Sequence, residues 1–344
     1  MPRLRRLILA IFCAATAFPV YAATSQEVCP AAPEPVVSLS FGSRYASDSD
    51  NRSALDEKSN AEVDAALEPV DDFLRSLTQA ANSLQTLEKK ERIAAADCIL
   101  GQIAVWAQAN ALGDLASNNA KLTMGSRIAG FGLVLMQVEP HTKSTSDLDV
   151  IRPWLSGMMA EQMLFWEEDA SKGSKRGNLR AWAALAGVSV GVINRDPVIE
   201  GWATASAAYI MCISNEDGSL PQEMSRGKWA LHYQLHAIAP LVLSTALLMQ
   251  QGTDLTQQCD NALERIVGFA ISDLSNEGAA SEEITGEAQS LFDGTRELKN
   301  WQLAWLEAYN SVYFDQDLVE MTEGLRPLIY SKLGGDQTLI WAGL

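Results

Sequence analysis

The stretch AWAALAGVSVGVINRDP, residues 181–197, combines the two signals that decide the fold. Apolar residues recur every three or four positions as far as Ile193, which is the spacing of a buried helix face. Two polar residues then interrupt the pattern, and Asp196 before Pro197 is typical of a new helix, with an N-cap carboxylate and a proline at the first helical position. The stretch therefore predicts two successive helices joined by a tight turn.

The same alternation of amphipathic runs and short breaks continues in both directions along most of the chain. Helical spacing of apolar residues is clear in residues 93–112, 151–168 and 231–249. Strand signals are sparse, because residues 36–41 alternate in polarity but no hairpin turn and partner strand follow them. We expect an all-α fold whose repeating unit is a helix pair of roughly 35–50 residues, as in a helical array or toroid.

The first 22 residues have the organisation of a signal peptide. Three arginines precede an apolar run at residues 7–18, and small residues stand at the −3 and −1 positions of a cleavage site after Ala22. The run is too short to span a bilayer. We therefore expect an exported protein, periplasmic or secreted, with no membrane contact after cleavage. Since no linker divides the helices, we expect one domain at residues 23–344.

Composition narrows the class of protein further. The chain has 344 residues, 47% of them hydrophobic, and 43 acidic against 26 basic side chains give a net charge of −17. So much apolar material excludes a disordered chain, and the acidic surface argues against nucleic acid as a partner. Cleavage of the signal peptide would remove three arginines and no acidic residue, so the mature protein is more acidic still.

Four cysteines follow the signal peptide: Cys29, Cys98, Cys212 and Cys259. An even number in an exported chain favours disulfides over zinc, and the sequence contains no C-x-x-C. Three pairings are possible. We favour Cys29–Cys98, which would tie down the N-terminal arm, and Cys212–Cys259 then follows by elimination. Two buried free thiols are the alternative to this second bridge.

One motif is set aside at once. Residues 187–191 (GVSVG) match the G-x-S-x-G pattern of a nucleophile elbow, which requires a strand before the serine and a sharp turn at it. Here the pattern lies inside a helical apolar run, so we expect small residues that pack closely between helices.

Two of the three histidines fall within residues 226–236 (RGKWALHYQLH). On a helix, Trp229, Tyr233 and His236 form one stripe, and His232 lies one turn before His236. Such a stripe can line a cleft; the alternative is a helix that buries its aromatic residues and has histidine at its edge. A zinc site would need a glutamate and a third ligand that are not evident, so we expect neither metal nor cofactor.

A second concentration of polar chemistry occupies residues 172–182 (KGSKRGNLRAW). Four cations without an acid are unusual in so acidic a chain, and they indicate local capture of an anionic ligand. The alternative is a solvated helix start. Asn178 and Trp182 share a helix face, and an amide beside an aromatic platform suits a sugar ring.

Taken together, these segments resemble the alginate lyases of polysaccharide lyase family 5 and its relatives, from about residue 29 to residue 331. The matching pieces, in order, are SLSFGSRY at residues 38–45, Lys58, Asp97-Cys98 followed by Trp106-Ala107, residues 178–182, residues 226–241 and residues 304–309 (AWLEAY). The resemblance implies an incomplete (α/α) toroid with a deep cleft and a first disulfide like Cys29–Cys98. It also implies β-elimination on an anionic polysaccharide, without a required metal.

The reaction explains the residue types. The carboxylate of a uronate must be neutralised before its C5 proton can be removed, because an enolate develops there. A base then takes the proton and an acid protonates the leaving O4. The resemblance gives Asn178 the neutralising role, but Leu179, Trp229 and His236 replace the histidine, arginine and tyrosine of the family. We therefore expect a divergent lyase.

The expected site draws on the remaining polar residues of both motifs. Catalytic roles are assigned as follows: Asn178 with Arg180 or Arg226 as neutralisers, His236 or His232 as base, and Tyr233 as acid or as part of a tyrosine–histidine relay. Expected substrate-binding residues are Arg44, Tyr45, Lys58, Lys175, Trp182 and Trp229, the first three on a mobile lid loop at about residues 43–60. The alternative function is a non-catalytic glycan-binding protein of an exopolysaccharide secretion system.

Overall fold

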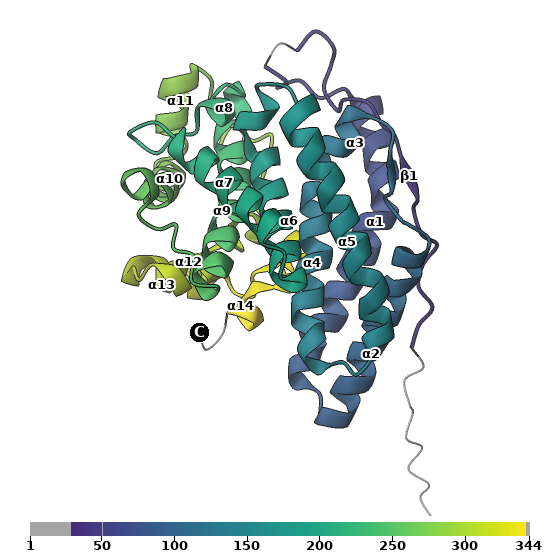
Figure 1. The fold of residues 1–344 in the computed structure, drawn as a ribbon. Helices are drawn as coiled ribbons and strands as arrows, with labels where there is room; N and C mark the ends of the chain where they lie inside the picture. Colours follow the sequence, from purple (N-terminus) through teal and green to yellow (C-terminus); the bar gives the residue numbers. More distant parts are fainter. Residues whose placement is uncertain (1–28, 50, 342–344) are drawn as a thin grey trace, which may run out of the picture. The chain divides into compact units, whose positions relative to one another are not determined.

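The computed structural model describes residues 29–49 and 51–341, and a compact unit begins at Ala31. The predicted signal peptide lies outside the described residues. In this unit α-helices dominate, and strands are confined to short pairs (Figure 1). Each helix predicted from periodicity is present, with ends shifted by a few residues.

The helices, in chain order, are α1 (Glu57–Ser83), α2 (Lys89–Gln108), α3 (Asn118–Thr123), α4 (Gly125–Val138), α5 (Thr145–Leu164), α6 (Asn178–Asn194), α7 (Pro197–Cys212), α8 (Pro221–Met224), α9 (Ala230–Gln250), α10 (Gln258–Ser275), α11 (Ala279–Thr285), α12 (Leu306–Val312), α13 (Gln316–Leu325) and α14 (Gln337–Ile340). The strands are β1 (Ser38–Leu39), β2 (Asp114–Leu115), β3 (Ile329–Tyr330) and β4 (Gly335–Asp336). Short turns of 3₁₀-helix and one π-helical turn, Phe165–Asp169, join several of them.

The centre of the unit is α6, which packs against α4, α7 and α9 (Figure 1). Small residues allow these helices to approach closely. A Cβ at Gly187 would lie 2.7 Å from the Cβ of Ala203 on α7, and a Cβ at Gly132 would meet the Ser189 hydroxyl. Ser189 is fully buried and donates to the Ala186 carbonyl at 2.9 Å. The GVSVG motif is therefore a packing surface, as expected.

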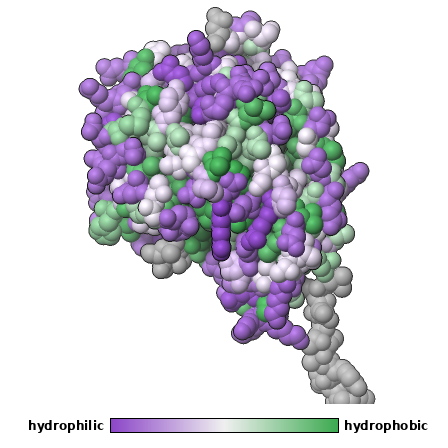
Figure 2. All heavy atoms as spheres, in the orientation of Figure 1, coloured by the Kyte–Doolittle hydropathy of each residue, from purple (hydrophilic) through white to green (hydrophobic). Residues whose placement is uncertain are grey.

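Helix α9 is the core helix of the C-terminal part of this unit. The segment Gly227–Gln250 is long and apolar enough to cross a membrane by length and composition, but 83% of its most apolar window is buried inside the protein. Its apolar character is therefore explained by packing against α6, α10 and α12. The outer face shown in Figure 2 is largely hydrophilic, with hydrophobic residues scattered in small groups.

The alternating residues 36–41 find a partner far along the chain. Strand β1 pairs in parallel with β2, with Ser38 opposite Asp114 and Leu39 opposite Leu115. The Ser38 hydroxyl donates to the Asp114 carboxylate at 2.7 Å. This pairing places the segment that follows β1 near the start of α3.

The lid loop, residues 43–56, forms a closed hairpin-like excursion. Tyr45 bridges to Leu55 in antiparallel fashion, and the Asp56 N–H donates to the Arg44 carbonyl at 2.9 Å. The Asp56 carboxylate then accepts the Ser59 N–H at 2.8 Å and caps α1. The expected loop at 43–60 is thus wrong at its end, because this cap starts the helix at Glu57.

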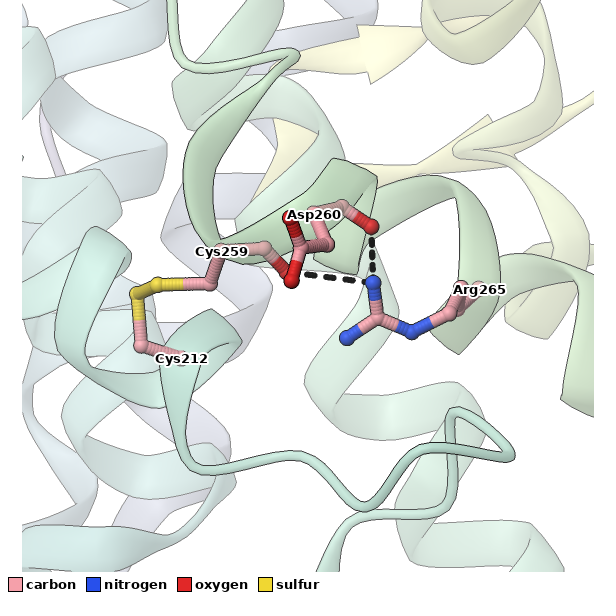
Figure 3. The surroundings of a disulfide bond; sticks show 4 residues. All are labelled: Cys212, Cys259, Asp260 and Arg265. Carbon is pink, nitrogen blue, oxygen red and sulfur yellow. Dashed lines mark hydrogen bonds between the residues drawn. A yellow bond between two sulfur atoms is a disulfide. The ribbon is translucent and has the colours of Figure 1, made fainter.

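A disulfide joins Cys212, at the end of α7, to Cys259, at the start of α10, with the Cα atoms 5.3 Å apart (Figure 3). The pairing reached by elimination is confirmed, and the free-thiol alternative is wrong. Arg265 lies beside the bridge and donates to the carbonyls of Cys259 and Asp260. Cys29 and Cys98 are also disulfide-bonded. Their pairing with each other stays a prediction.

Candidate active site

The candidate site lies on the one partly exposed face of α9. Nearly every residue from Ala230 to Leu248 is buried, but His232, Tyr233 and His236 are only partly so. Their rings form a continuous row, with centroids 5.0 Å apart for His232–Tyr233 and 6.4 Å for Tyr233–His236. Trp229 extends the row at one end, 5.6 Å from His232. The structure therefore brings together the stripe that the sequence predicts.

Both histidines of the row already use a ring lone pair. The Trp182 indole N–H donates to His236 Nε2 at 3.1 Å. The Gln302 amide nitrogen lies 3.3 Å from His232 Nδ1, and its amide oxygen is fixed by the Lys299 N–H at 3.0 Å. This orientation makes Gln302 the donor, so the proton of neutral His232 resides on Nε2.

The pKa values of these histidines keep them neutral. Burial lowers the pKa of His232 to about 3, with help from the charges of Arg296 and Arg226. Burial also lowers the pKa of His236 well below its usual value. Both rings are therefore neutral, and because their lone pairs already accept from Trp182 and Gln302, each has an N–H left to donate. The expected role of His236 or His232 as base stays a prediction, and this hydrogen bonding does not favour it.

Tyr233 instead belongs to a phenol pair beneath a guanidinium. Its hydroxyl is hydrogen-bonded to the hydroxyl of Tyr45 from the lid loop. The Arg226 guanidinium lies 4.0 Å from the Tyr233 ring centroid and 5.0 Å from that of Tyr45. Burial and the neighbouring Tyr45 raise the pKa of Tyr233, and the charge of Arg226 opposes this rise.

Two side chains of the site bond to the backbone of the loop that we expect to act as a lid. Arg226 donates from Nε to the Asn51 carbonyl at 3.0 Å and from Nη2 to the Arg52 carbonyl at 2.7 Å. The Trp229 indole donates to the Ser53 carbonyl at 2.7 Å. We call these three hydrogen bonds the lid latch. Trp229, only 7% exposed, is a latch residue in this state rather than an open platform for sugar.

Asn178, the first residue of α6, is held by a carboxylate that the sequence did not single out. Its backbone N–H donates to Glu223 Oε1 at 2.6 Å, and its amide nitrogen donates to Glu223 Oε2 at 2.9 Å. Glu223 lies in α8 and is 1% exposed. An amide nitrogen has two N–H groups, so one remains for a ligand.

Ionisation of the buried Glu223 carboxyl lowers the free energy of unfolding. Burial raises its pKa to about 7, against the lowering effect of the Asn178 hydrogen bonds and Arg226. Because the folded pKa lies above the unfolded one, the stability is fully present below pH 4.5, is lost as the pH rises from 4.5 through 7, and then levels off. From pH 5 to pH 8, wild type should lose about 2.5 kcal/mol of unfolding free energy relative to Glu223→Gln in urea titrations.

The matched control for this measurement is Glu282→Gln, because Glu282 is exposed on α11. This variant should follow the pH dependence of wild type. Parallel stability curves for wild type and Glu223→Gln would refute the raised pKa of Glu223.

A pocket of about 440 Å³ opens beside the Asn178–Glu223 pair. It lies between the lid loop, the turn before α6 and α8. Its lining residues are Asn51, Arg52, Ser171, Gly173, Ser174, Gly177, Asn178, Leu179, Gln222, Glu223, Ser225 and Arg226. Asn178 and Arg226 thus face one pocket, with the phenol pair next to Arg226.

The cations of residues 172–182 do not join this pocket. Arg180 donates to the Ser206 hydroxyl at 3.1 Å and to Glu167 at 2.8 Å, and it lies over Trp202. Lys175 donates to the Glu167 carbonyl at 2.6 Å. Both therefore point to the α6–α7 side. Arg226 rather than Arg180 is placed to assist Asn178.

Three other expected binding residues have different surroundings. Trp182 is 1% exposed, so it orients His236 and cannot offer its face to a sugar. Lys58 is on the first turn of α1, with its side chain 87% exposed and 3.8 Å from Glu62. Arg44 is bonded to α1 through Asn60 at 2.7 Å. It thereby anchors the base of the lid loop beside Tyr45.

The C-terminal part of the chain adds residues that periodicity could not reveal. The Arg296 guanidinium lies 4.1 Å from the Trp229 ring centroid. Trp301, Gln302 and Tyr330 join His232 and His236 around a cavity of about 10 Å³. Trp301 and Gln302 lie in a 3₁₀ turn and Tyr330 in a two-residue strand, elements too short to give a periodic signal in the sequence. In the described part of the chain, no three histidine, cysteine or acidic residues gather as a metal site would require.

Comparison with known proteins agrees with this architecture. The sequence profile described as Alginate lyase matches residues 40–280. The alginate lyase of Pseudomonas syringae pv. tomato is 26% identical over 321 residues, which cover 91% of this chain and 82% of the relative. An alginate lyase of Pseudomonas aeruginosa is 26% identical over 322 residues, covering 91% of this chain and 85% of the relative.

Solved structures share the fold. Alginate lyase A1-III from Sphingomonas species A1 superposes with a TM-score of 0.72 at 23% identity, covering 92% of this chain and 87% of that one. A variant of A1-III complexed with tetrasaccharide gives a TM-score of 0.74 at the same identity and coverage. The predicted all-α fold, an incomplete (α/α) toroid, is confirmed. Because the family profile spans well over half of the sequence, the chain belongs to the alginate lyase family.

Proposed function

We propose that this protein is a polysaccharide lyase that cleaves a 1,4-linked uronate polymer of the alginate class by β-elimination. One observation carries the proposal: Asn178 and Arg226 face the same pocket, and Arg226 lies directly over the ring of Tyr233. Neutraliser and proton-transfer group are therefore adjacent. The relatives named alginate lyase and the A1-III variant complexed with tetrasaccharide support the same substrate class.

The first requirement of the reaction is to neutralise the uronate carboxylate. The free N–H of the Asn178 amide and the Arg226 guanidinium can donate to its oxygens, where charge increases as the enolate forms. Glu223 holds the Asn178 amide in one orientation through two hydrogen bonds. The donors are thus fixed before substrate arrives, which reduces the cost of orienting them during the reaction.

The second requirement is proton transfer, and the phenol pair supplies it. Burial raises the pKa of Tyr233, and Arg226 over its ring opposes this rise, so a minor phenolate form is available as the base. The Tyr45 hydroxyl can donate to the phenolate oxygen. The phenolate takes the C5 proton, the C5–H electron pair forms the C4–C5 double bond, and the C4–O4 bond breaks. The Tyr233 hydroxyl then returns the proton to O4. His232 and His236, neutral N–H donors, would bind sugar hydroxyls.

Export remains part of the proposal. The described cysteines are disulfide-bonded, which fits an oxidising compartment such as the periplasm or the exterior. The predicted signal peptide would direct the chain to export.

The test is direct. Incubation with polymannuronate, polyguluronate and glucuronan should raise the absorbance near 235 nm on at least one of them, because the product carries an unsaturated uronate. A protein that binds one of these polymers without any absorbance rise would instead be the glycan-binding protein named above.

A further inference from the structure

A second pocket, of about 380 Å³, lies far from the candidate active site. It is formed by the first turn of α2 and by residues 140–143, which connect α4 to α5. Helix α1 begins beside the lid loop and ends beside the start of α2 (Figure 1). Because α1 has 27 residues, its axis separates this pocket from the lid loop by about 40 Å.

The charged lining of this pocket is entirely basic. Lys89, Arg92 and Lys143 line it, and among the described residues no acidic side chain does. Glu88 and Glu91, the acids adjacent in sequence, are exposed and lie outside the lining. Three cations in one pocket are unusual in a chain with 43 acidic and 26 basic side chains. We call this pocket the basic pocket.

The protein itself does not neutralise these cations. Within residues 29–49 and 51–341, none of the three forms a salt bridge with a carboxylate. The nearby acids are engaged elsewhere, since Glu139 pairs with Arg152 and Asp97 accepts the backbone N–H of Lys143 at 2.9 Å. The positive charge of the basic pocket is therefore available to an anion from solution.

The shape and the donors of the basic pocket suit a carboxylate on a sugar ring. Arg92 Nη2 donates to the Leu87 carbonyl at 2.8 Å, which fixes the guanidinium, and Arg92 Nε makes no hydrogen bond among the described residues. His141 adds a ring N–H. Guanidinium and ammonium groups bind carboxylates through charge-assisted hydrogen bonds. Ile93 and Pro140 give the wall an apolar part, against which the C–H groups of a ring can pack.

We propose that the basic pocket is a second, non-catalytic binding site for the uronate polymer, which holds one of its carboxylates away from the cleft. The site rests on the proposed function, because its ligand is the polymer that the lyase would cleave. A concave pocket of this size fits a small ring better than a flat anionic surface such as a membrane. Since the rest of the surface is acidic, the pocket binds a polyanion locally.

Two binding sites on one protein have a consequence for long chains. A polymer held at the basic pocket keeps its other segments close to the cleft, which raises their effective concentration there. A tetrasaccharide is too short to reach both places. The basic pocket should therefore strengthen binding of long polymers and leave binding of short fragments unchanged.

The experiment compares long polymannuronate with a mannuronate tetrasaccharide, by calorimetric titration and by the initial rate of absorbance increase near 235 nm. The variant combines Lys89→Met and Lys143→Met, because both side chains are exposed. At low salt it should bind the long polymer about tenfold more weakly than wild type, and the difference should shrink at high salt. Its affinity for the tetrasaccharide and its kcat on it should equal those of wild type.

The matched control combines Lys90→Met and Arg195→Met, which remove the same charge at exposed positions outside the basic pocket. It should bind the long polymer like wild type. Melting curves of both variants confirm that the fold is retained.

The outcomes distinguish this site from the lyase proposal. Unchanged polymer affinity in the pocket variant, or an equal loss in the control, overturns the second site and leaves the lyase proposal intact. Loss of binding to phosphatidylglycerol vesicles with unchanged polymer binding also overturns it and assigns the pocket to a membrane surface. Failure of wild type to bind any uronate polymer overturns both proposals. The expected loss in a protein that binds but cleaves no polymer supports the second site alone.

Discussion

Tyr233→Phe should lower kcat by about a thousandfold, with KM changed little. The substitution keeps the ring beneath Arg226 but removes the hydroxyl that we assign to both proton transfers. Loss of a general acid–base group typically costs between about a hundredfold and ten-thousandfold. The measurement is the initial rate of absorbance increase near 235 nm at saturating polymer.

The pH dependence adds a second criterion. With the phenolate as the reactive base, kcat of wild type should rise with pH through the neutral and alkaline range. Because the pKa of Tyr233 is raised, this rise should continue beyond the pH of about 10 at which an ordinary tyrosine is half ionised. The residual activity of Tyr233→Phe should lack this rise. Tyr313→Phe is the matched control, since Tyr313 stacks on Tyr309 at the end of α12. Full activity in Tyr233→Phe would exclude the assigned role.

Arg226→Met should lower kcat/KM by roughly a hundred- to a thousandfold and release the lid loop. One side chain neutralises the substrate carboxylate, lies over the phenol pair and holds the carbonyls of Asn51 and Arg52. Arg226→Lys should restore little, because an ammonium cannot reproduce the planar fork that bonds two carbonyls while stacking on a ring. Hydrogen exchange of residues 43–56 should accelerate in both variants.

The control for this experiment is Arg75→Met, because Arg75 is exposed on α1 and pairs with Asp72. It should leave the rate of cleavage and the exchange of the lid loop unchanged. Normal activity together with accelerated exchange in Arg226→Met would show that Arg226 serves the lid alone.

Much of the fold follows from local sequence. The Asp196–Pro197 start and the apolar spacing around it define α6 and α7, and the Asp196 carboxylate caps the Val198 N–H at 2.9 Å. Strand β1 could not be paired from sequence, because its partner β2 lies far along the chain and carries no turn signal. The disulfide at Cys212 could be reached only by elimination.

The candidate site also has a part that sequence could predict and a part that it could not. The stripe on α9 was predictable, because residues at helical spacing share a face whatever surrounds them. The protonation of His236 was not, because it depends on the Trp182 indole, which sequence interpretation had assigned to a sugar. Glu223 lies in α8, a helix of four residues that is too short to show periodicity. Its contact with Asn178 arises from tertiary packing alone.

The lid latch recognises peptide carbonyls, not side chains. Arg226 and Trp229 bond to the main-chain oxygens of residues 51–53, which every amino acid carries. Substitutions at residues 51–53 can therefore leave these three hydrogen bonds in place and still change the chemistry of the pocket wall that Asn51 and Arg52 form. Two constraints remain: residue 52 must adopt a positive φ, and the Ser53 N–H loses an acceptor if Asn51 Oδ1, at 3.1 Å, is removed. Within these limits the wall of the pocket can change in evolution while the attachment of the loop is retained.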